Sequence, residues 1–400
     1  MACQRFAGAY GEFTGAANEH ITSVLKELNS IYQALAHAPA YNDGGGRKTK
    51  GNEYYWKVFS MKKAIGFLDQ YAQPIRNPKD LEDFRREFSK GGKKGIGKKT
   101  WEKIREIVTF GKLQRIDSLR SNPGIRSMLE FTKIWGVGAA TAASLYKKGF
   151  RSVEDLRRHQ GAGLLNHNQT VGLKHFEDLQ RRMQRSEVEE IIGVVKRNAE
   201  YELPGVVVVA CGSYRRGSPT SGDVDLLMTH ETERAKLIGN FLPSLVKRLK
   251  ENGFITDELS TSFHHRRRKH INESKMCFAV CRLPRAAGGP ARLHRRLDLK
   301  ICLREHFAFA LIHFTGDDYF NRSIRWYAHK KGLTLSEYGL CEATRVNRER
   351  VWEGRSVACQ TEKDVFDVLG LEYKEPTQRN VVSGGRIVAE READGSPGTP

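Results

Sequence analysis

The chain has 400 residues, of which 39% are hydrophobic and 28% are charged. This length allows about two to four compact domains, and no stretch approaches the ~20 apolar residues that span a bilayer, which excludes an integral membrane protein. Lysine and arginine number 67 against 47 acidic residues, for a net charge of +20. We therefore expect a polyanionic partner, and nucleic acid is favoured over a membrane surface because the cations are spread along the chain.

The first twenty residues contain one arginine and no apolar block, so we expect neither a secretory signal nor a transit peptide. Seven cysteines are an odd and sparse set, unlike a secreted disulfide scaffold. These features predict reduced thiols and an intracellular protein.

The first half of the chain is predicted to be helical. Residues 1–20 are expected to form a flexible terminus, and apolar residues at helical spacing predict a helix over 21–35. Residues 39–53 are rich in glycine and charge, which indicates a loop. From there to about residue 200, short amphipathic patterns separated by glycine and proline predict an all-α region.

The second half has the pattern of a mixed α and β structure. Strands are predicted over 205–210, 223–228, 276–283 and 296–303, where β-branched runs or alternating patterns occur. The basic run 264–270 is expected to be a surface loop that adds DNA affinity, with a nuclear import signal as an alternative. The end of the chain, 377–400, loses periodicity and is expected to be disordered.

A short phrase occurs twice in the helical half. Gly95 and Gly97 flank an isoleucine, and Gly136 and Gly138 flank a valine, each just before a helix. Glycines let the backbone turn tightly and bring amide N–H groups to an anion such as a DNA phosphate. One copy alone is more typical of an ordinary turn between helices, but two copies in a strongly basic chain favour phosphate binding.

Three aspartates have the pattern of a metal site. Asp223 and Asp225 lie two residues apart on a predicted strand, so both face one side while Val224 and Leu226 face the core. Two like charges this close need a cation, and two Mg²⁺ ions about 3.5–4 Å apart would suit a phosphoryl transfer. Asp298, on a later predicted strand, is the expected third ligand. The alternative is a pair of solvated carboxylates at a strand edge.

The sequence around this pair resembles a known catalytic domain. Gly212-Ser213, a nine-residue gap, the Asp-x-Asp pair and the later aspartate resemble the palm that family X DNA polymerases share with poly(A) polymerases and small-molecule nucleotidyltransferases. Longer phrases are similar to family X DNA polymerases, closest to DNA polymerase beta. These phrases are 165–176, 211–217, 221–225, 313–321 and 361–367.

The resemblance covers roughly residues 20 to 378. The lack of a further domain before residue 20 favours a beta-type member over the lambda or terminal-transferase types. Unusual segments at 41–51 and 286–292 favour a divergent protist source, such as a kinetoplastid beta-type enzyme.

The resemblance implies a multidomain fold. It comprises all-α lyase and fingers-type helical domains with two helix-hairpin-helix motifs, then an α/β nucleotidyltransferase palm, then an α+β nucleotide-selecting domain. The expected bounds are a flexible terminus at 1–20, a lyase domain at 21–120, a duplex-binding domain at 121–185, the palm at 186–304, the nucleotide-selecting domain at 305–376 and a disordered tail at 377–400.

The resemblance also implies roles for individual residues. The catalytic ligands of two Mg²⁺ ions would be Asp223, Asp225 and Asp298, with Asp298 helping to activate the primer hydroxyl. Contacts to the incoming dNTP would come from Arg182, Ser213, Arg216, Gly222, Phe314, Gly316, Asp318 and Asn321. DNA contacts would come from Gly95, Gly97, Lys99, Gly136, Gly138, Arg296, Arg322 and Arg325. The backbones of Thr132, Ile134 and Val137 would hold Na⁺ or K⁺. His313 stands where beta-type enzymes carry tyrosine.

A second activity is implied in the first helical domain. Lys99 and Lys103 share one helix face, and a lysine crowded by cations can be a neutral amine that forms a Schiff base with an abasic sugar. Lys103 matches the nucleophile of a 5′-deoxyribose phosphate lyase, with Lys99 holding the 5′-phosphate. A row of solvated DNA-facing lysines is the alternative. Tyr55 and Phe59 replace a phosphate-binding lysine and a tyrosine of beta-type enzymes, which predicts weakened lyase activity.

The sequence thus predicts a template-directed polymerase that fills short gaps in base excision repair. Gapped or nicked DNA, dNTPs and other repair proteins are the expected partners of a monomer, in the nucleus or the mitochondrion. A template-independent nucleotidyltransferase and a non-catalytic DNA-gap-binding protein are the alternatives. Cys277 and Cys281, with the histidines of 264–270, give only a minor indication of zinc.

Overall fold

The computed structural model describes residues 18–37, 52–71, 73–89, 96–159, 163–261, 274–285, 289, 291–346 and 349–380. The segment 264–270, residues 39–51 of the predicted loop 39–53, and most of both termini lie outside these ranges. The loop prediction was wrong for residues 52–53, which begin a helix. Contacts divide the chain into two compact units, with the division between Leu164 and Leu165. This division is coarser than the expected domains, whose bounds stay predictions.

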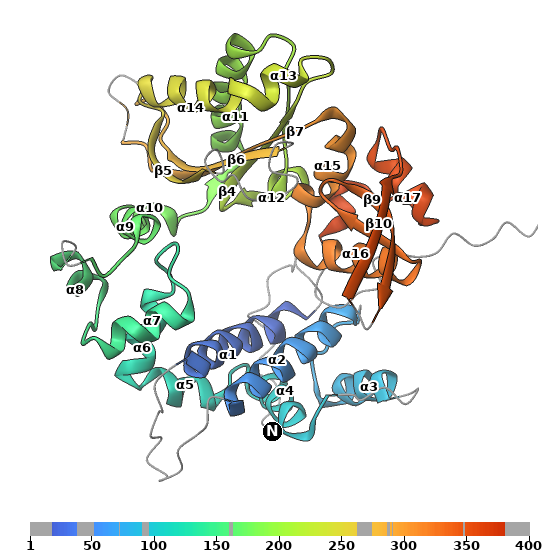
Figure 1. Ribbon diagram of the computed structural model, residues 1–400. Coiled ribbons are helices and arrows are strands. Elements are labelled where there is room, and N and C mark those ends of the chain that lie inside the picture. The colour runs from blue at the N-terminus through green and yellow to red at the C-terminus, as the bar shows by residue number, and fades with distance from the viewer. Residues whose placement is uncertain are drawn as a thin grey trace, which may run out of the picture. The chain divides into compact units, whose positions relative to one another are not determined.

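The first unit is all-α within the described residues, as the sequence predicts (Figure 1). Its helices are α1 (Glu19–His37), α2 (Asn52–Gln70), α3 (Pro78–Ser89), α4 (Lys98–Phe110), α5 (Gln114–Arg120), α6 (Pro123–Phe131), α7 (Ala139–Lys147) and α8 (Val153–Arg158). The apolar residues of α1 recur at helical spacing and form its buried face, since Leu25, Leu28 and Ile31 are fully buried.

The folded part of this unit begins earlier than residue 21. Asn18 is buried, and its side-chain amide donates to the carbonyls of Leu68 (3.3 Å) and Tyr71 (3.0 Å) while its Oδ1 accepts from the backbone of Ile75 (2.8 Å). A single polar residue far from its partners in the chain leaves no periodic signal, so the predicted flexible terminus 1–20 was wrong for residues 18–20.

The second unit contains a five-stranded sheet with helices packed on it. Its elements are α9 (His167–Lys174), α10 (Phe176–Leu179), β1 (Met183–Gln184), α11 (Arg185–Glu202), β2 (Val207–Ala210), α12 (Gly212–Arg215), β3 (Thr220–Ser221), β4 (Asp223–Thr229), α13 (Arg234–Lys236), a π-helical turn (Leu237–Phe241), α14 (Leu242–Glu251), β5 (Ile255–Thr261), β6 (Ser274–Cys281) and β7 (Arg295–Cys302). The strand order is β2-β4-β7-β6-β5, and only β4 and β7 are parallel neighbours. β1 and β3 form a separate short pair.

The four predicted strands are confirmed as β2, β4, β6 and β7, and β5 is an additional strand. β5 escapes a period-2 search because Asp257 and Glu258 interrupt its apolar residues and its pairing with β6 shifts register twice. α11 and α14 lie together on one face of the sheet (Figure 1). Their apolar residues bury Val224 and Leu226 of β4, which leaves residues 223 and 225 toward the other face.

The rest of this unit is a helical layer beside a three-stranded antiparallel sheet. It comprises a 3₁₀ turn (Arg304–His306), α15 (Phe307–Thr315), α16 (Asp318–Lys330), β8 (Leu333–Ser336), β9 (Gly339–Val346), β10 (Glu349–Ser356), α17 (Glu362–Leu369) and a second 3₁₀ turn (Pro376–Arg379). Phe309, Phe320 and Phe366 form its core. The predicted disordered tail at 377–400 begins too early, because Arg379 is fully buried here.

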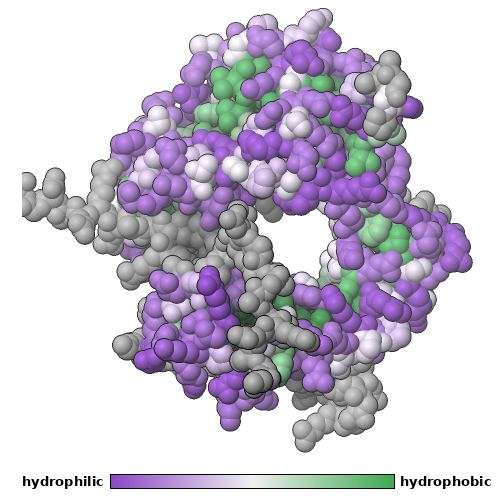
Figure 2. Space-filling model, turned by 180° about the vertical axis from the view of Figure 1, so that it is seen from behind, coloured by the Kyte–Doolittle hydropathy of each residue, from purple (hydrophilic) through white to green (hydrophobic). Residues whose placement is uncertain are grey.

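The visible surface is mainly hydrophilic (Figure 2), which agrees with a chain in which 28% of residues are charged. Among the described residues, every helix is too short or too polar to cross a membrane.

Leu245 on α14 tests the contribution of the helix layer to stability. Its side chain is fully buried against the sheet, so Leu245→Ala is expected to destabilise the chain by about 2–5 kcal/mol. The unfolding midpoint in urea should fall. Lys247→Ala, on the exposed face of the same helix, should change it little, and an equal effect of both variants would contradict the packing described.

Candidate functional site

Three carboxylates meet where β4 and β7 run side by side. The parallel register places Asp225 opposite Asp298 and Asp223 opposite Arg296. Asp298 is buried, at 5% exposure, whereas Asp223 and Asp225 are partly exposed. The residues that the sequence singled out as a cluster therefore lie together, on the face of the sheet opposite α11 and α14.

Two cations lie between these carboxylates. Arg296 contacts Asp223 at 3.1 Å and Asp298 at 3.4 Å through Nη2. Lys300 Nζ lies 2.5 Å from Asp225 and 3.8 Å from Asp298. Each aspartate therefore has a positive partner, and both partners come from the same strand as Asp298.

The protonation behaviour of the cluster reflects its burial. Burial raises the pKa of Asp298 to about 6, although Lys300 and Arg296 act in the opposite direction. Burial also raises the pKa of Asp223, and the neighbouring Asp225 adds to that increase. For Lys300, burial alone would lower the pKa, but Asp225 and Asp298 outweigh it and raise the pKa. Buried carboxylates with raised pKa values indicate a site that gains from additional positive charge.

A tight turn brings the backbone of α12 against the cluster. Gly212 has φ +56°, and a Cβ atom at this position would collide with Oδ2 of Asp225. Only glycine allows this approach. Ser213, the next residue, donates from its Oγ to Oγ of Ser221 at 3.2 Å. Ser221 directly precedes Gly222.

Two of the predicted phosphate contacts lie at this turn and are held by hydrogen bonds. Arg182 donates to Oγ1 (2.7 Å) and the carbonyl (2.6 Å) of Thr220. Arg216 donates to the carbonyl of Thr315 (2.6 Å) and to Oδ1 of Asn380 (2.8 Å). Cationic side chains fixed in this way can hold an anion beside the carboxylates without losing much side-chain entropy.

The predicted nucleotide-selecting residues lie at the junction of α15 and α16. His313 and Phe314 lie in the last turn of α15, and Asp317 caps α16 by accepting from the backbone N–H of Phe320 at 2.8 Å. Gly316, with φ +71°, separates the two helices.

The side chains on the first turns of α16 make local contacts. Asn321 donates to the carbonyl of His313 at 2.8 Å, and Arg325 Nη2 lies 3.0 Å from Nδ1 of the same histidine. Arg322 pairs with Asp318 at 2.6 Å on the surface. Burial lowers the pKa of His313, so the ring is the neutral form near pH 7.

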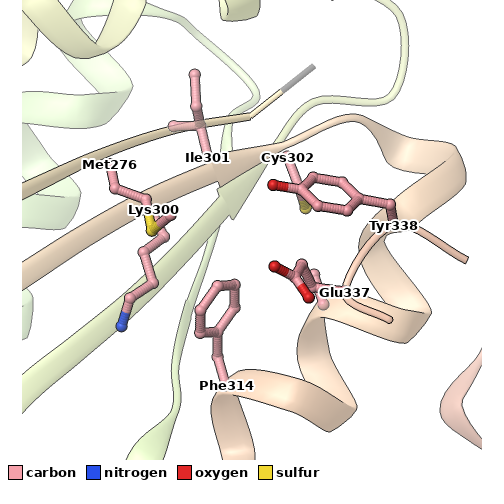
Figure 3. Close-up of a pocket in the computed structure, with 8 residues that line it drawn as sticks. Met276, Lys300, Ile301, Cys302, Phe314, Glu337 and Tyr338 are labelled. Atoms are coloured by element: carbon pink, nitrogen blue, oxygen red, sulfur yellow. The ribbon is translucent and has the colours of Figure 1, made fainter. Parts of the chain in front are cut away.

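A small pocket lies beside the carboxylates, between the end of β7 and α15 (Figure 3). Phe314, Glu337 and Tyr338 point into it, and the ammonium of Lys300 lies 4.6 Å from the centre of the Phe314 ring. Sequence patterns do not indicate Glu337 and Tyr338, because these residues reach the pocket from the connection between β8 and β9.

The first unit carries the remaining predicted residues, apart from Gly95, which lies outside the described residues. Gly97 caps α4, which carries Lys99 and Lys103. Lys103 Nζ donates to the carbonyl of Lys99 at 2.9 Å. Burial lowers the pKa of Lys103, and the nearby charge of Lys57 lowers it further.

The second glycine phrase forms the turn between α6 and α7. Gly136 has φ +83° and Gly138 is the N-cap of α7. Thr132 ends α6, and the backbone of Val137 donates to the carbonyl of Ile134 at 3.0 Å. The glycine phrase therefore forms a turn between two helices, with backbone N–H groups at the start of α7, and its assignment as a helix-hairpin-helix motif stays a prediction.

Comparison with known proteins finds family models that match most of this architecture. The family model of the DNA polymerase beta palm matches residues 182–304, the beta thumb matches 310–380, and the fingers domain of DNA polymerase lambda matches 129–180. Similar curated proteins include DNA polymerase lambda of Rattus norvegicus (37% identity, 91% of this chain, 56% of that protein) and of Arabidopsis thaliana (36%, 91%, 62%). DNA-directed DNA/RNA polymerase mu of Homo sapiens is 31% identical over 88% of this chain and 68% of that protein.

The chain belongs to the family X DNA polymerases. It spans about six tenths of the length of the two lambda relatives. The resemblance to this family is confirmed, with palm and thumb models of the beta type and curated relatives of the lambda and mu types.

The palm and thumb of this family X polymerase are joined by a buried ion-pair network that sequence inspection missed. Glu362 of α17 accepts from Arg215 at 2.7 and 3.0 Å and from Arg379 at 2.6 Å. Burial alone would raise the pKa of Glu362, but these hydrogen bonds outweigh it and lower the pKa. Arg215 also donates to Oγ1 of Thr315 at 2.7 Å, so the network links α12 to α15.

Glu362→Gln tests this network. The change leaves Arg379 buried with its charge uncompensated, so we expect a loss of about 3–5 kcal/mol in stability, measured as a lower unfolding midpoint. Glu305→Gln is a matched control, because its pair with Arg234 is exposed on both sides and is worth less than about 1 kcal/mol. Similar losses for both variants would show that burial does not strengthen the network.

Proposed function

We propose that the chain is a template-directed DNA polymerase that fills short gaps in DNA by two-metal nucleotidyl transfer. The observation that carries this proposal is the convergence of Asp223, Asp225 and Asp298 on neighbouring parallel strands beside the Gly212 turn. Family membership gives the chemistry a context, since the relatives are named as DNA polymerases lambda and mu.

The donor set suits Mg²⁺. All three side chains are carboxylates, the hard oxygen ligands that this ion prefers, and burial already raises the pKa values of Asp298 and Asp223. Bound Mg²⁺ would supply charge stabilisation for the oxygens of the transferred phosphate. Arg296 and Lys300 pair with the same carboxylates, so bound Mg²⁺ would compete with these ion pairs.

The protein side chains have separate tasks in this proposal. Asp298 lies deepest and would accept the proton of the primer 3′-hydroxyl, which then attacks the α-phosphate as pyrophosphate leaves. The triphosphate would lie against Arg182, Ser213, Arg216 and Gly222, since two of these are cations at the turn beside the cluster. The sugar and base would lie against Phe314, Gly316, Asp318 and Asn321.

DNA would be held mainly through its phosphates. The backbone N–H groups after Gly136 and Gly138, and those after Gly95 and Gly97, would bind the sugar-phosphate backbone as helix-hairpin-helix motifs. Carbonyls of Thr132, Ile134 and Val137 would hold Na⁺ or K⁺ at the second motif. Arg322 and Arg325 would face the template strand, and Arg296 would be a further DNA contact. The net charge of +20 supports such binding.

Lyase activity at an incised abasic site is the second part of the proposal. It is supported by the lowered pKa of Lys103 and by its position one turn from Lys99. The exposed side chains of Tyr55 and Phe59, at 62% and 55%, offer no charge to a 5′-phosphate, which supports a weakened activity. The monomeric state, repair partners and nuclear or mitochondrial compartment stay predictions.

Asp298→Asn tests the polymerase proposal. Extension of a primer across a one-nucleotide gap with a 5′-phosphate should fall by roughly 10²–10⁴-fold, while DNA binding, measured by fluorescence anisotropy, is retained. Glu251→Gln, at an exposed position on α14, should extend normally. Retained extension by the aspartate variant would remove residue 298 from catalysis, and equal extension of the primer without template would favour the template-independent alternative.

Lys103→Ala tests the lyase proposal. Borohydride trapping of the chain on an incised abasic site should disappear, whereas Lys112→Ala, at an exposed position, should trap normally. Because only the neutral amine attacks the aldehyde, trapping by the unchanged chain should rise with pH, with a half-maximum below the ordinary lysine value of 10.5. Undiminished trapping by Lys103→Ala would point to another lysine.

A further inference from the structure

Two histidines and two aspartates form a cluster away from the catalytic carboxylates. His175 follows α9, Asp178 lies on α10, Asp257 lies on β5, and His294 immediately precedes β7. All belong to the second unit. The catalytic carboxylates and the ion-pair network described above do not involve any of them.

The cluster is compact. One ligand atom from each of His175, Asp178 and His294 can be chosen so that all three lie within 4.8 Å of one another. The two rings are close, with centroids 4.0 Å apart and planes inclined by 35°. His175 is 5% exposed at the side chain, and Asp178 and His294 are 26% and 19% exposed. The group is therefore largely withdrawn from solvent but still open to an ion from one side.

Each histidine has a carboxylate at one ring nitrogen. His175 Nε2 lies 2.7 Å from Oδ2 of Asp257, and His294 Nδ1 lies 2.8 Å from Oδ2 of Asp178. The same Asp178 oxygen accepts from the backbone N–H of His294 at 2.9 Å. For His175, the carboxylate of Asp257 at Nε2 fixes the tautomer and leaves Nδ1 as the possible ligand atom, which is the arrangement found around histidine ligands of zinc. Asp178 lies close enough to His294 to be a ligand beside it.

The charges of the cluster are compatible with binding of a divalent cation. Two carboxylates face two imidazoles, and the ammonium of Lys174 lies 2.7 Å from Oδ1 of Asp257. Mutual repulsion disfavours two protonated rings at this separation. A carboxylate can bind either Mg²⁺ or Zn²⁺, but a pair of imidazoles favours Zn²⁺.

We propose that His175, Asp178 and His294 bind one Zn²⁺ ion, with water as the fourth ligand and Asp257 as the residue that positions His175. Zinc–nitrogen bonds of ~2.0–2.1 Å separate tetrahedral ligands by roughly 3.3–3.5 Å. The present spacing of up to 4.8 Å and the two rings with centroids 4.0 Å apart therefore require the three side chains to reorient when the ion binds. The site joins α10 to the start of β7, four residues before Asp298.

Such a site would be structural. It lies at the N-terminal end of β7, the strand that carries Arg296, Asp298 and Lys300. Loss of the ion should therefore destabilise that end of the strand rather than remove a reacting group. This role is independent of the polymerase proposal, because zinc content and thermal stability can be measured in the absence of nucleotide and DNA.

The test uses the full chain, stripped with a chelator and then given ZnCl₂ in excess Mg²⁺ so that the catalytic carboxylates are occupied. Zinc retained after gel filtration is measured by atomic emission, and the thermal midpoint is recorded. We expect one tightly held equivalent and a raised midpoint. No retained zinc, or zinc without any rise in the midpoint, would overturn the proposal.

Substitutions of the proposed ligands test where the zinc ion binds. His175→Gln with His294→Gln should abolish the tight equivalent, and Asp257→Asn should weaken zinc binding by about 10–100-fold. If the double variant fails to fold, as judged by circular dichroism, Asp178→Asn provides the same test at nearly constant volume. Equal zinc retention in these variants and the unchanged chain would overturn the proposal.

Two controls address other histidines. His329→Gln changes an exposed ring on α16, and a triple change of His264, His265 and His270 to glutamine removes the histidine-rich segment. Both should keep the tight equivalent and the rise in the midpoint. Loss of zinc in the triple variant alone would assign the ion to that segment and contradict the site at His175.

Discussion

Three carboxylates held within reach of one another repel, and the second unit is arranged around that repulsion. The parallel pairing of β4 and β7 sets the three aspartates face to face, and the same strand β7 supplies both compensating cations, Arg296 and Lys300. The compensation is incomplete, since burial still raises the pKa of Asp298 to about 6. This residual demand for positive charge is the physical basis of the metal site that we propose.

The elements around the carboxylate cluster support it from the opposite face of the sheet and from the thumb. α11 and α14 bury the opposite face of the sheet, so the acidic side chains lie on the face that these helices do not cover. The thumb is held to the palm by Glu362 and its two arginines, together with an apolar cluster that joins Cys211, Leu227 and Cys302 to Ala310 of α15. A polar joint of this kind specifies one geometry, because any other leaves a charge buried without a partner.

Local patterns predicted most of the fold and the centre of the site. Alternation on β4 and β7 predicted both strands and placed Asp223, Asp225 and Asp298 on one face, and the structure brings them together as expected. The motif family was also recognisable from short phrases. What these patterns left out were contacts between residues far apart in the chain.

The omissions have a common physical cause. Arg379 lies in a segment without periodicity, yet its guanidinium is fully buried on Glu362. β5 was missed because acidic residues interrupt it, and one of them, Asp257, meets His175 from 82 positions away. Polar side chains that find distant partners leave no periodic signature, so their burial becomes visible only in three dimensions.

β7 limits how this chain can vary. It is paired on both sides, with β4 and with β6, and Arg296, Asp298 and Lys300 occupy alternate positions. Slipping such a strand by a single residue would turn every side chain to the opposite face. Evolution can therefore exchange residues in β7 one at a time, but an insertion or deletion within it would put a leucine in the place of Asp298, and length changes must be confined to the connections outside the strand.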